Sequence, residues 1–258
     1  MRARFILLAT ALVAVPSIAV AQDERPRRVR VGVGPQFNPG FPGSEEMRLR
    51  PLITVTSARG EDPFAFGAPG DGPSFAIADN GTFAFGPAFR FEGRRGSGDA
   101  GGGLTPVGRT IELGGFAALW ARPWLRLRAD VRKGLGGHNG VVSTIGADYV
   151  ARDADRWLWS LGPRATLADG RRERAYFGVD PASAARTGLP LYTPRGGLES
   201  VGAAGRVTYA FTPTWGIHGQ AQYARLVHDA GDSPIVRRID SRDQWTIGAA
   251  LTYTFFIR

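Results

Sequence analysis

Residues 125–132 read Leu-Arg-Leu-Arg-Ala-Asp-Val-Arg, with apolar and charged side chains at alternating positions. Successive side chains of a β-strand point to opposite faces of the sheet. Alternation over this length is therefore typical of a strand with one apolar face and one charged face. The stretch decides the fold class, because the same pattern recurs along most of the chain.

The recurring period of two predicts an all-β protein. We expect twelve strands, at residues 28–37, 48–58, 63–68, 73–78, 82–91, 109–121, 124–134, 141–152, 156–168, 198–211, 214–227 and 243–256. Residues 63–68 and 73–78 are short and rich in Gly and Pro, so ten strands is the alternative.

Alternation alone fits both a soluble sandwich and an outer-membrane barrel, in which the apolar face meets lipid. Strand length favours the barrel, because the segments approach the roughly 9–11 residues of a tilted membrane strand, and soluble strands average about five or six. The connections also favour it. Short turns at residues 79–81, 122–123, 153–155 and 212–213 alternate with long connections at 92–108, 169–197 and 228–242.

Four tryptophans lie beside the predicted short turns. They are Trp120, Trp124, Trp157 and Trp215. Tryptophan is enriched at membrane interfaces, so these residues are interpreted as an aromatic girdle. We therefore expect a single antiparallel up-and-down transmembrane β-barrel over residues 22–258.

The composition excludes several other classes. The chain of 258 residues has 36 Gly, 18 Pro and no Cys, with a mean hydropathy of −0.14. A helical membrane protein needs several apolar runs of about 20 residues, which this balance does not supply. The absence of Cys excludes disulfides, thiolate zinc sites and a cysteine nucleophile. The net charge of +9 comes almost entirely from Arg, because Lys133 is the only lysine.

The first 21 residues have the organisation of a cleavable signal peptide. Two arginines precede an apolar stretch over residues 5–15, and Ala19 and Ala21 occupy the small-residue positions of a cleavage site. We expect cleavage before Gln22 and export to the bacterial outer membrane. The expected surroundings are outer-membrane lipid and lipopolysaccharide, and nucleic acid is not expected as a partner.

Several short motifs carry a resemblance to a known family. They are Val31-Gly32-Val33-Gly34, Phe41-Pro42-Gly43-Ser44, Arg50-Pro51-Leu52, Tyr176-Phe177-Gly178-Val179, Gly188-Leu189-Pro190-Leu191-Tyr192, Ser233-Pro234-Ile235-Val236 and Thr252-Tyr253-Thr254-Phe255. In this order and spacing the chain resembles the MipA/OmpV family, from about Val29 to Phe255. The resemblance implies an outer-membrane barrel and a scaffolding role that links the lytic transglycosylase MltA to a murein synthase. Other members of the family are described as porin-like.

The polar faces of the predicted strands supply the candidate lumen residues. They are Arg90, Glu112, Arg126, Arg128, Asp130, Arg132, Asp148, Arg164, Arg206, His218, Gln220 and Gln222. One interpretation is a network of ion pairs that plugs a narrow lumen, because side chains largely fill a small barrel. The other is a pore that prefers anions. The sequence favours the first interpretation.

No residue set predicts catalysis, a cofactor or a metal site. His228, Asp229, Asp232 and Ser233 include the residue types of a hydrolase, but they are too close in sequence for the geometry of a triad. We therefore expect a non-enzymatic envelope scaffold of the MipA/OmpV type, with a porin-like channel for small, anionic solutes as the alternative. Residues 176–194 are unusually apolar for a free loop, so we expect them either to fold into the barrel mouth or to pack as a short helix around residues 181–186.

Overall fold

The structure is a computed structural model that describes residues 26–257. The predicted signal peptide lies outside the described residues. Within them, the strands are β1 (Arg27–Pro39), β2 (Met47–Arg59), β3 (Ala78–Asp79), β4 (Phe83–Glu92), β5 (Thr110–Arg122), β6 (Leu125–Gly136), β7 (Val141–Asp153), β8 (Trp157–Asp169), β9 (Gly196–Ala210), β10 (Trp215–Leu226) and β11 (Asp243–Ile257). The helices are α1 (Gly170–Phe177), α2 (Pro181–Thr187), α3 (His228–Asp232) and α4 (Pro234–Arg238).

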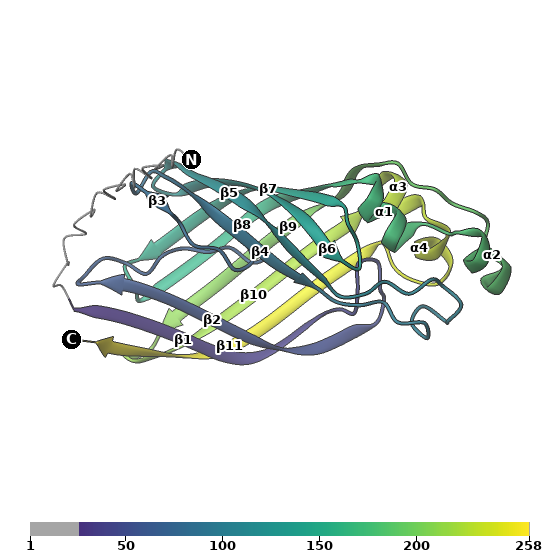
Figure 1. Cartoon of the computed structure of the whole chain (residues 1–258). Coiled ribbons are helices and arrows are strands. Elements are labelled where there is room, and N and C mark those ends of the chain that lie inside the picture. The colour runs from purple at the N-terminus through teal and green to yellow at the C-terminus, as the bar shows by residue number, and fades with distance from the viewer. Residues whose placement is uncertain (1–25, 258) are drawn as a thin grey trace, which may run out of the picture.

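All these strands form one antiparallel sheet in the order β2-β1-β11-β10-β9-β8-β7-β6-β5-β4-β3. The first strand pairs with the last, with Arg27 opposite Ile257, so the sheet rolls up (Figure 1). The structure confirms the antiparallel, barrel-type fold, and the strand count differs, with eleven in the described chain rather than twelve. No ladder among the described residues joins β2 to β3, and this leaves a seam in the wall.

The molecule has two distinct ends. The short turns, the start of β1 and the end of β11 lie at one end, which we call the turn end. The four helices lie at the other, which we call the loop end (Figure 1). Ten of the predicted strands are found within two residues of their predicted limits.

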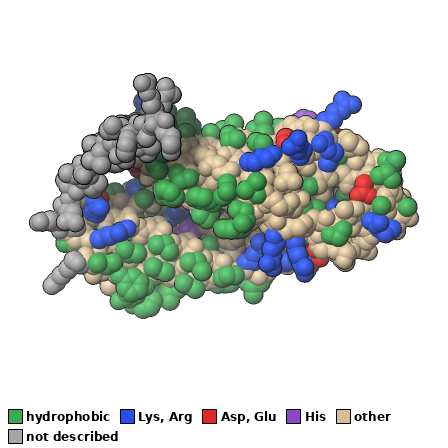
Figure 2. All heavy atoms as spheres, viewed as in Figure 1, with side chains coloured by type: hydrophobic (Ala, Val, Ile, Leu, Met, Phe, Trp, Pro, Cys, Tyr) green, Lys and Arg blue, Asp and Glu red, His purple; other side chains and the backbone are tan. Residues whose placement is uncertain are grey.

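The two faces of the wall differ in polarity as the alternation predicts. In β6, Leu127 and Val131 are 40% and 55% exposed, whereas Arg128 and Arg132 are buried. Figure 2 shows hydrophobic side chains over the outer surface of the strands, and lysine and arginine side chains gathered nearer the loop end. Apolar residues outside and charged residues inside are the arrangement of a barrel whose outer wall meets lipid.

Residues 63–72, which we call the interior segment, run inside the barrel. The Phe64 N–H donates to Asp155 at 2.9 Å, and Arg152 donates to the Phe64 carbonyl at 2.9 Å. The Phe66 ring meets the Trp120 ring edge-on, with 5.8 Å between centroids. The predicted strand at residues 63–68 is therefore wrong.

The sequence of the interior segment explains why it leaves the sheet. Pro63 and Pro69 have no N–H to donate to a ladder. Gly70 and Gly72 adopt positive φ angles of +85° and +70°, which strands do not use. Residues 73–79 then run along β4 with irregular pairing, and only β3 is regular enough to form a ladder there.

The four helices form a cap over the loop end. Side chains from four separate connections meet in one buried cluster, which contains Phe41, Val107, Tyr176, Phe177 and Val236. A second cluster contains Leu104, Val179, Leu189 and Ile235. The cap therefore has an apolar core of its own, which mobile outer loops lack.

Sequence reasoning predicted one of these helices and missed the other three, of which α1 is the longest. The helix expected at residues 181–186 is confirmed as α2. Helix α1 was expected to be an irregular connection. It begins at Asp169, whose side chain accepts the N–H groups of Arg171 and Arg172. None of the helices in the described residues is long and apolar enough to cross a membrane.

Candidate functional site in the barrel interior

The strands place the predicted lumen residues on the inner side of the wall. Glu112, Arg126, Arg128, Asp130, Arg132, Asp148, Arg164 and His218 are buried. Arg90, Arg206, Gln220 and Gln222 are half-buried. Buried charges are expensive unless they are paired, so the partners of these residues decide what the interior does.

The loop-end cluster is centred on Glu112. This carboxylate accepts hydrogen bonds from Arg132 Nε at 2.9 Å, Arg172 Nη1 at 3.0 Å and His138 Nε2 at 3.1 Å. Arg172 also binds both carboxylate oxygens of Glu199, at 2.8 and 3.2 Å. The planar guanidinium fork suits such bidentate pairing. Five side chains from β5, β6, α1, β9 and the β6–β7 turn are thus joined under the cap.

The central cluster contains three arginines and two aspartates. Arg126 Nη1 lies 2.9 Å from Asp71 of the interior segment and 3.4 Å from Asp148. Asp148 also pairs with Arg164 at 2.5 Å. The nearest carboxylate to Arg128 is Asp71, at 3.7 Å. Each aspartate is therefore shared between two guanidinium groups.

Polar contacts continue toward the turn end. His218 lies 3.2 Å from the Thr208 hydroxyl and 3.2 Å from Gln220, which donates to Gln36 at 2.8 Å. Arg206 donates to Thr208 at 3.2 Å and to a backbone carbonyl of the interior segment. Hydrogen bonds to neutral acceptors therefore replace ion pairs around these side chains.

The remaining predicted residues contact the interior segment or a neighbouring strand. Arg90 donates to the Gly70 carbonyl, and the Gln222 side chain lies beside Gly70. Asp130 forms an ion pair with Arg132. The interior segment thus contacts polar side chains from several strands and occupies part of the space between them.

Four members of these clusters were not predicted, each for a physical reason. Glu199 lies at a register shift in the β8–β9 ladder, between Thr166 and Leu167 on β8, and a bulge of this kind turns a side chain off the expected face. Asp71 lies between the two short strands predicted at residues 63–68 and 73–78, in a connection to which alternation assigns no face. Arg172 and His138 lie in connections, where alternation gives no direction.

The predicted tryptophan girdle has three exposed members. Trp124, Trp157 and Trp215 are 47%, 36% and 42% exposed. Trp120 is half-buried and contacts Phe66 of the interior segment. It shares the inner face of β5 with Glu112, an even number of positions away, so its position does not fit an outward girdle.

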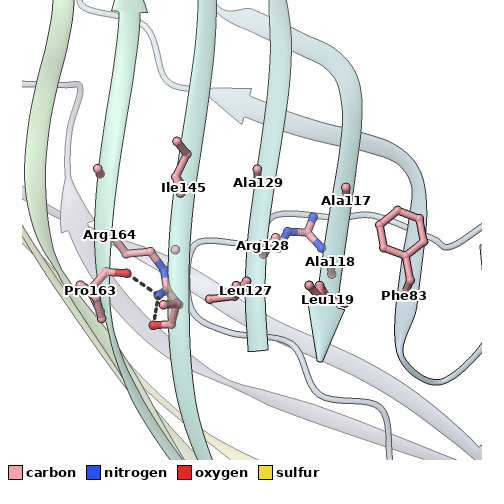
Figure 3. Close-up of a pocket in the computed structure, with 13 residues that line it drawn as sticks. Phe83, Ala117, Ala118, Leu119, Leu127, Arg128, Ala129, Ile145, Pro163 and Arg164 are labelled. Atoms are coloured by element: carbon pink, nitrogen blue, oxygen red, sulfur yellow. Dashed lines mark hydrogen bonds between the residues drawn. The ribbon is translucent and has the colours of Figure 1, made fainter. Parts of the chain in front are cut away.

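The outer wall carries an apolar depression of about 460 Å³. Figure 3 shows Leu127 and Ala129 on β6 beside Ala117 and Leu119 of β5, with the Arg128 side chain between them on the strand's other side. The small side chains of Ala117 and Ala129 account for the hollow. Most of its lining residues are apolar, which is the polarity expected of a lipid-facing wall.

The cap contains carboxyl groups whose pKa values are raised. Burial, with the nearby charges of Glu199 and Asp229, raises the pKa of Glu173 to about 7. Burial likewise raises the pKa of Asp240 to about 6. Both carboxyl groups change their protonation near neutral pH, so the charge of the cap depends on pH in this range.

The residues that resembled a hydrolase site do not converge. Ser233 donates to the Phe177 carbonyl at 2.7 Å, Asp229 accepts the Arg195 N–H at 2.7 Å, and His228 is exposed. Ser233 and Asp229 thus stabilise the local structure of the cap through hydrogen bonds to its backbone. Within residues 26–257 there is no group of three or more His, Cys, Asp or Glu side chains that could hold a metal ion.

Comparisons with known proteins bear on this interior and its wall. The MltA-interacting protein of Escherichia coli (strain K12) is 33% identical over 82 residues, which is 31% of this chain and 31% of that protein. The relative from Shigella flexneri gives the same values. The chain thus aligns with less than a third of the length of these curated relatives.

Two solved structures have a similar course of the chain. The NanC porin has 8% sequence identity and a TM-score of 0.45, and the alignment covers 86% of this chain and 98% of that one. The outer membrane protein OprD from Pseudomonas aeruginosa has 11% identity and a TM-score of 0.37, covering 89% and 65%.

A family profile matches a far longer part of the sequence than either relative. It is the profile of the MltA-interacting protein MipA, and it matches residues 31–255, which is nearly the whole described chain. The match begins in β1 and ends in β11, so it spans the wall, the interior segment and the cap. The chain therefore belongs to the MipA family of MltA-interacting proteins.

Proposed function

We propose that this protein is a non-enzymatic scaffold of the outer membrane, with a closed interior, that holds a lytic transglycosylase of the MltA type at the turn end. The signal peptide directs export and is removed before Gln22. Lipid and lipopolysaccharide surround the wall. A murein synthase is the second partner, as the family resemblance implies.

The observation that carries the proposal is the filling of the interior. Paired charges occupy its loop-end and central parts, the interior segment runs through it, and the apolar core of the cap lies over its loop end. A protein built to pass solutes keeps a continuous polar path, whereas here buried polar groups join neighbouring strands to one another, to the interior segment and to the cap. The barrel thus serves as a rigid anchor, and its turn end serves as the docking surface.

The turn end is the side that faces the periplasm in bacterial barrels, where murein lies. Arg122 and Arg156 are exposed on two of its short turns. We expect tagged wild-type protein in detergent to retain the cell's MltA-type transglycosylase. The double variant Arg122→Glu and Arg156→Glu should retain much less of it.

The matched control carries Arg171→Glu and Arg174→Glu. Both arginines are exposed on α1 at the loop end. The control changes net charge by the same amount and should retain the enzyme as wild type does. Failure of wild-type protein to retain any lytic transglycosylase would overturn the scaffold proposal. Equal loss of enzyme retention in both double variants would show that the turn end is not the docking surface.

A second candidate is a porin-like channel for small anions, favoured by the excess of arginine over carboxylates in the central cluster. Planar bilayers decide between the two. The closed interior predicts no steady conductance above that of the bilayer alone. A stable, anion-selective current would replace the closed-interior proposal with the channel.

A further inference from the structure

A chamber of about 790 Å³ lies between the interior segment and the inner faces of β4, β5 and β6. Five aromatic rings line it, from Phe64, Phe66, Phe83, Phe116 and Trp120. It reaches the short turns at the turn end, and its volume is in the range of sites that hold small organic ligands. Figure 2 shows a hollow near this end in which arginine and histidine side chains are visible behind the hydrophobic outer surface.

The inner wall of the chamber carries an excess of positive charge. Arg126 and Arg128 line it, and both rely on Asp71, while Asp148 is divided between Arg126 and Arg164. Two carboxylates therefore serve three guanidinium groups. The one carboxylate among the chamber's lining residues is Asp79, which is exposed at the rim.

Arg128 is the least satisfied of these arginines. It is 7% exposed, and its Nε has no hydrogen-bond partner among the described residues. Its Nη2 makes only long contacts, at 3.4 Å to the Asp71 carbonyl and 3.3 Å to Ser74. The guanidinium lies 4.0 Å from the centroid of the Phe116 ring, which holds it flat against the apolar wall.

We propose that the chamber binds an amphipathic organic anion, with a carboxylate head on Arg128 and an apolar body among the aromatic rings. The head supplies the negative charge that the central cluster lacks. The rings explain why a small inorganic anion would not suffice, because it would leave the apolar lining unfilled. The ligand enters at the turn end, since that is where the chamber is open.

Trp120 provides a direct probe, because its ring lies in the chamber. A bromine atom quenches tryptophan fluorescence on contact. We would titrate ω-bromoundecanoate into the full mature protein in neutral-lipid nanodiscs. The Trp120→Phe variant gives the signal of the other tryptophans, and the difference from wild type isolates the chamber.

We expect saturable quenching of the Trp120 signal in wild type. Arg128→Gln should weaken binding about tenfold, the usual effect of losing one charge-assisted hydrogen bond. Arg171→Gln, which removes the same charge from the exposed face of α1, should bind as wild type does. Ala76→Phe keeps every charge but fills the chamber, and it should also lose the quenching.

Three results would overturn the proposal. One is the absence of any quenching assigned to Trp120. Another is equal quenching by ω-bromoundecanol, which would show apolar partitioning without recognition of the head. The third is displacement of the probe by acetate at the same concentration, which would show a simple anion site. A folded barrel changes its gel mobility on heating, and the absence of this shift identifies a variant that has not folded. If one of Arg128→Gln and Ala76→Phe does not fold, the other variant provides the test.

Discussion

Glu112 is fully buried and accepts hydrogen bonds from three side chains at once, Arg132, Arg172 and His138. It therefore joins the wall to the cap through α1. Buried ion pairs of this kind add little to stability as a whole, but removal of one partner leaves the remaining buried charges with fewer partners. Substitution of Glu112 should therefore lower the stability of the protein more than substitution of any one of its partners.

We expect Glu112→Ala to lower the free energy of unfolding by about 3 kcal/mol, because three buried hydrogen bonds to a carboxylate are lost and Arg132 and Arg172 each keep only one carboxylate partner. Urea unfolding followed by tryptophan fluorescence measures this change. Glu61→Ala, at an exposed position, removes the same group and should change stability by less than about 0.5 kcal/mol. Equal changes in the free energy of unfolding for the two substitutions would show that Glu112 is not needed to pair the buried charges of the loop-end cluster.

The Glu173 carboxyl makes the cap sensitive to pH. Its pKa is raised to about 7 by burial and by Glu199 and Asp229, whereas the unfolded value is about 4.3. A raised carboxyl pKa means that the folded cap binds the proton more tightly. Its stability is therefore greatest below pH 4 and falls as the pH rises through 7, by up to about 3 kcal/mol.

Hydrogen exchange of α1 checks the sign of this effect. Protection of α1 should be greater at pH 5 than at pH 8 after correction for the intrinsic exchange rate. Glu173→Gln should make the protection nearly independent of pH and raise it at pH 8. Asp240→Asn tests the second carboxyl group in the same way, because the pKa of Asp240 is raised to about 6. Greater protection at pH 8 in wild type would contradict the argument.

The individual residues also show how far sequence reasoning extends. Alternation fixes which strand residues face inward, and it placed Arg128 and Arg132 on the buried face. It does not identify their partners, because the partners come from bulges, turns and helices. Glu199 faces inward through a bulge, and Arg172 reaches inward from a helix. A site built across several elements is therefore found only once the chain is folded.

Among the elements, the regular strands and the interior segment differ in how well the sequence specifies them. The long strands repeat one pattern over at least ten residues, so their limits are well defined. Residues 63–72 show short alternation at Phe64 and Phe66, which resembles a strand. Proline and glycine prevent the ladder, and arginines of the inner wall bind the free carbonyls instead.

The interior segment should shield the inner wall from reagents at the turn end. Because the chain has no Cys, Thr208→Cys introduces a single thiol beside Phe64 and Ala65. Replacing residues 64–71 with an equal length of Gly and Ser should speed its reaction with a charged maleimide at least about tenfold, since the wall then lacks its cover. Thr212→Cys, on an exposed turn, should react rapidly in both backgrounds. Equal rates for the thiol at position 208 would show that the segment does not cover the wall.

At the scale of the whole molecule, the wall is a rolled sheet with two edges. β1 has partners on both sides, and β2 has β1 on one side only. At the loop end Arg48 of β2 pairs with Asp99 at 2.9 Å, so the connection after β4 reaches across the seam there. The seam is thus bridged at the loop end, and no ladder joins β2 to β3 elsewhere along it in the described chain.

Hydrogen exchange in detergent tests this asymmetry, and β1 and β2 form a matched pair because each has 13 residues. In an antiparallel ladder, every second N–H of a strand points to each neighbour. We therefore expect about half of the β2 amides to exchange quickly, because they face the seam, while nearly all of the β1 amides exchange slowly. Within β2, the fast amides should lie toward the turn end, since the Arg48–Asp99 pair holds the other end in place. Equal protection of β1 and β2 would mean that the barrel closes its seam, and the seam-facing groups of β2 would then need a partner strand.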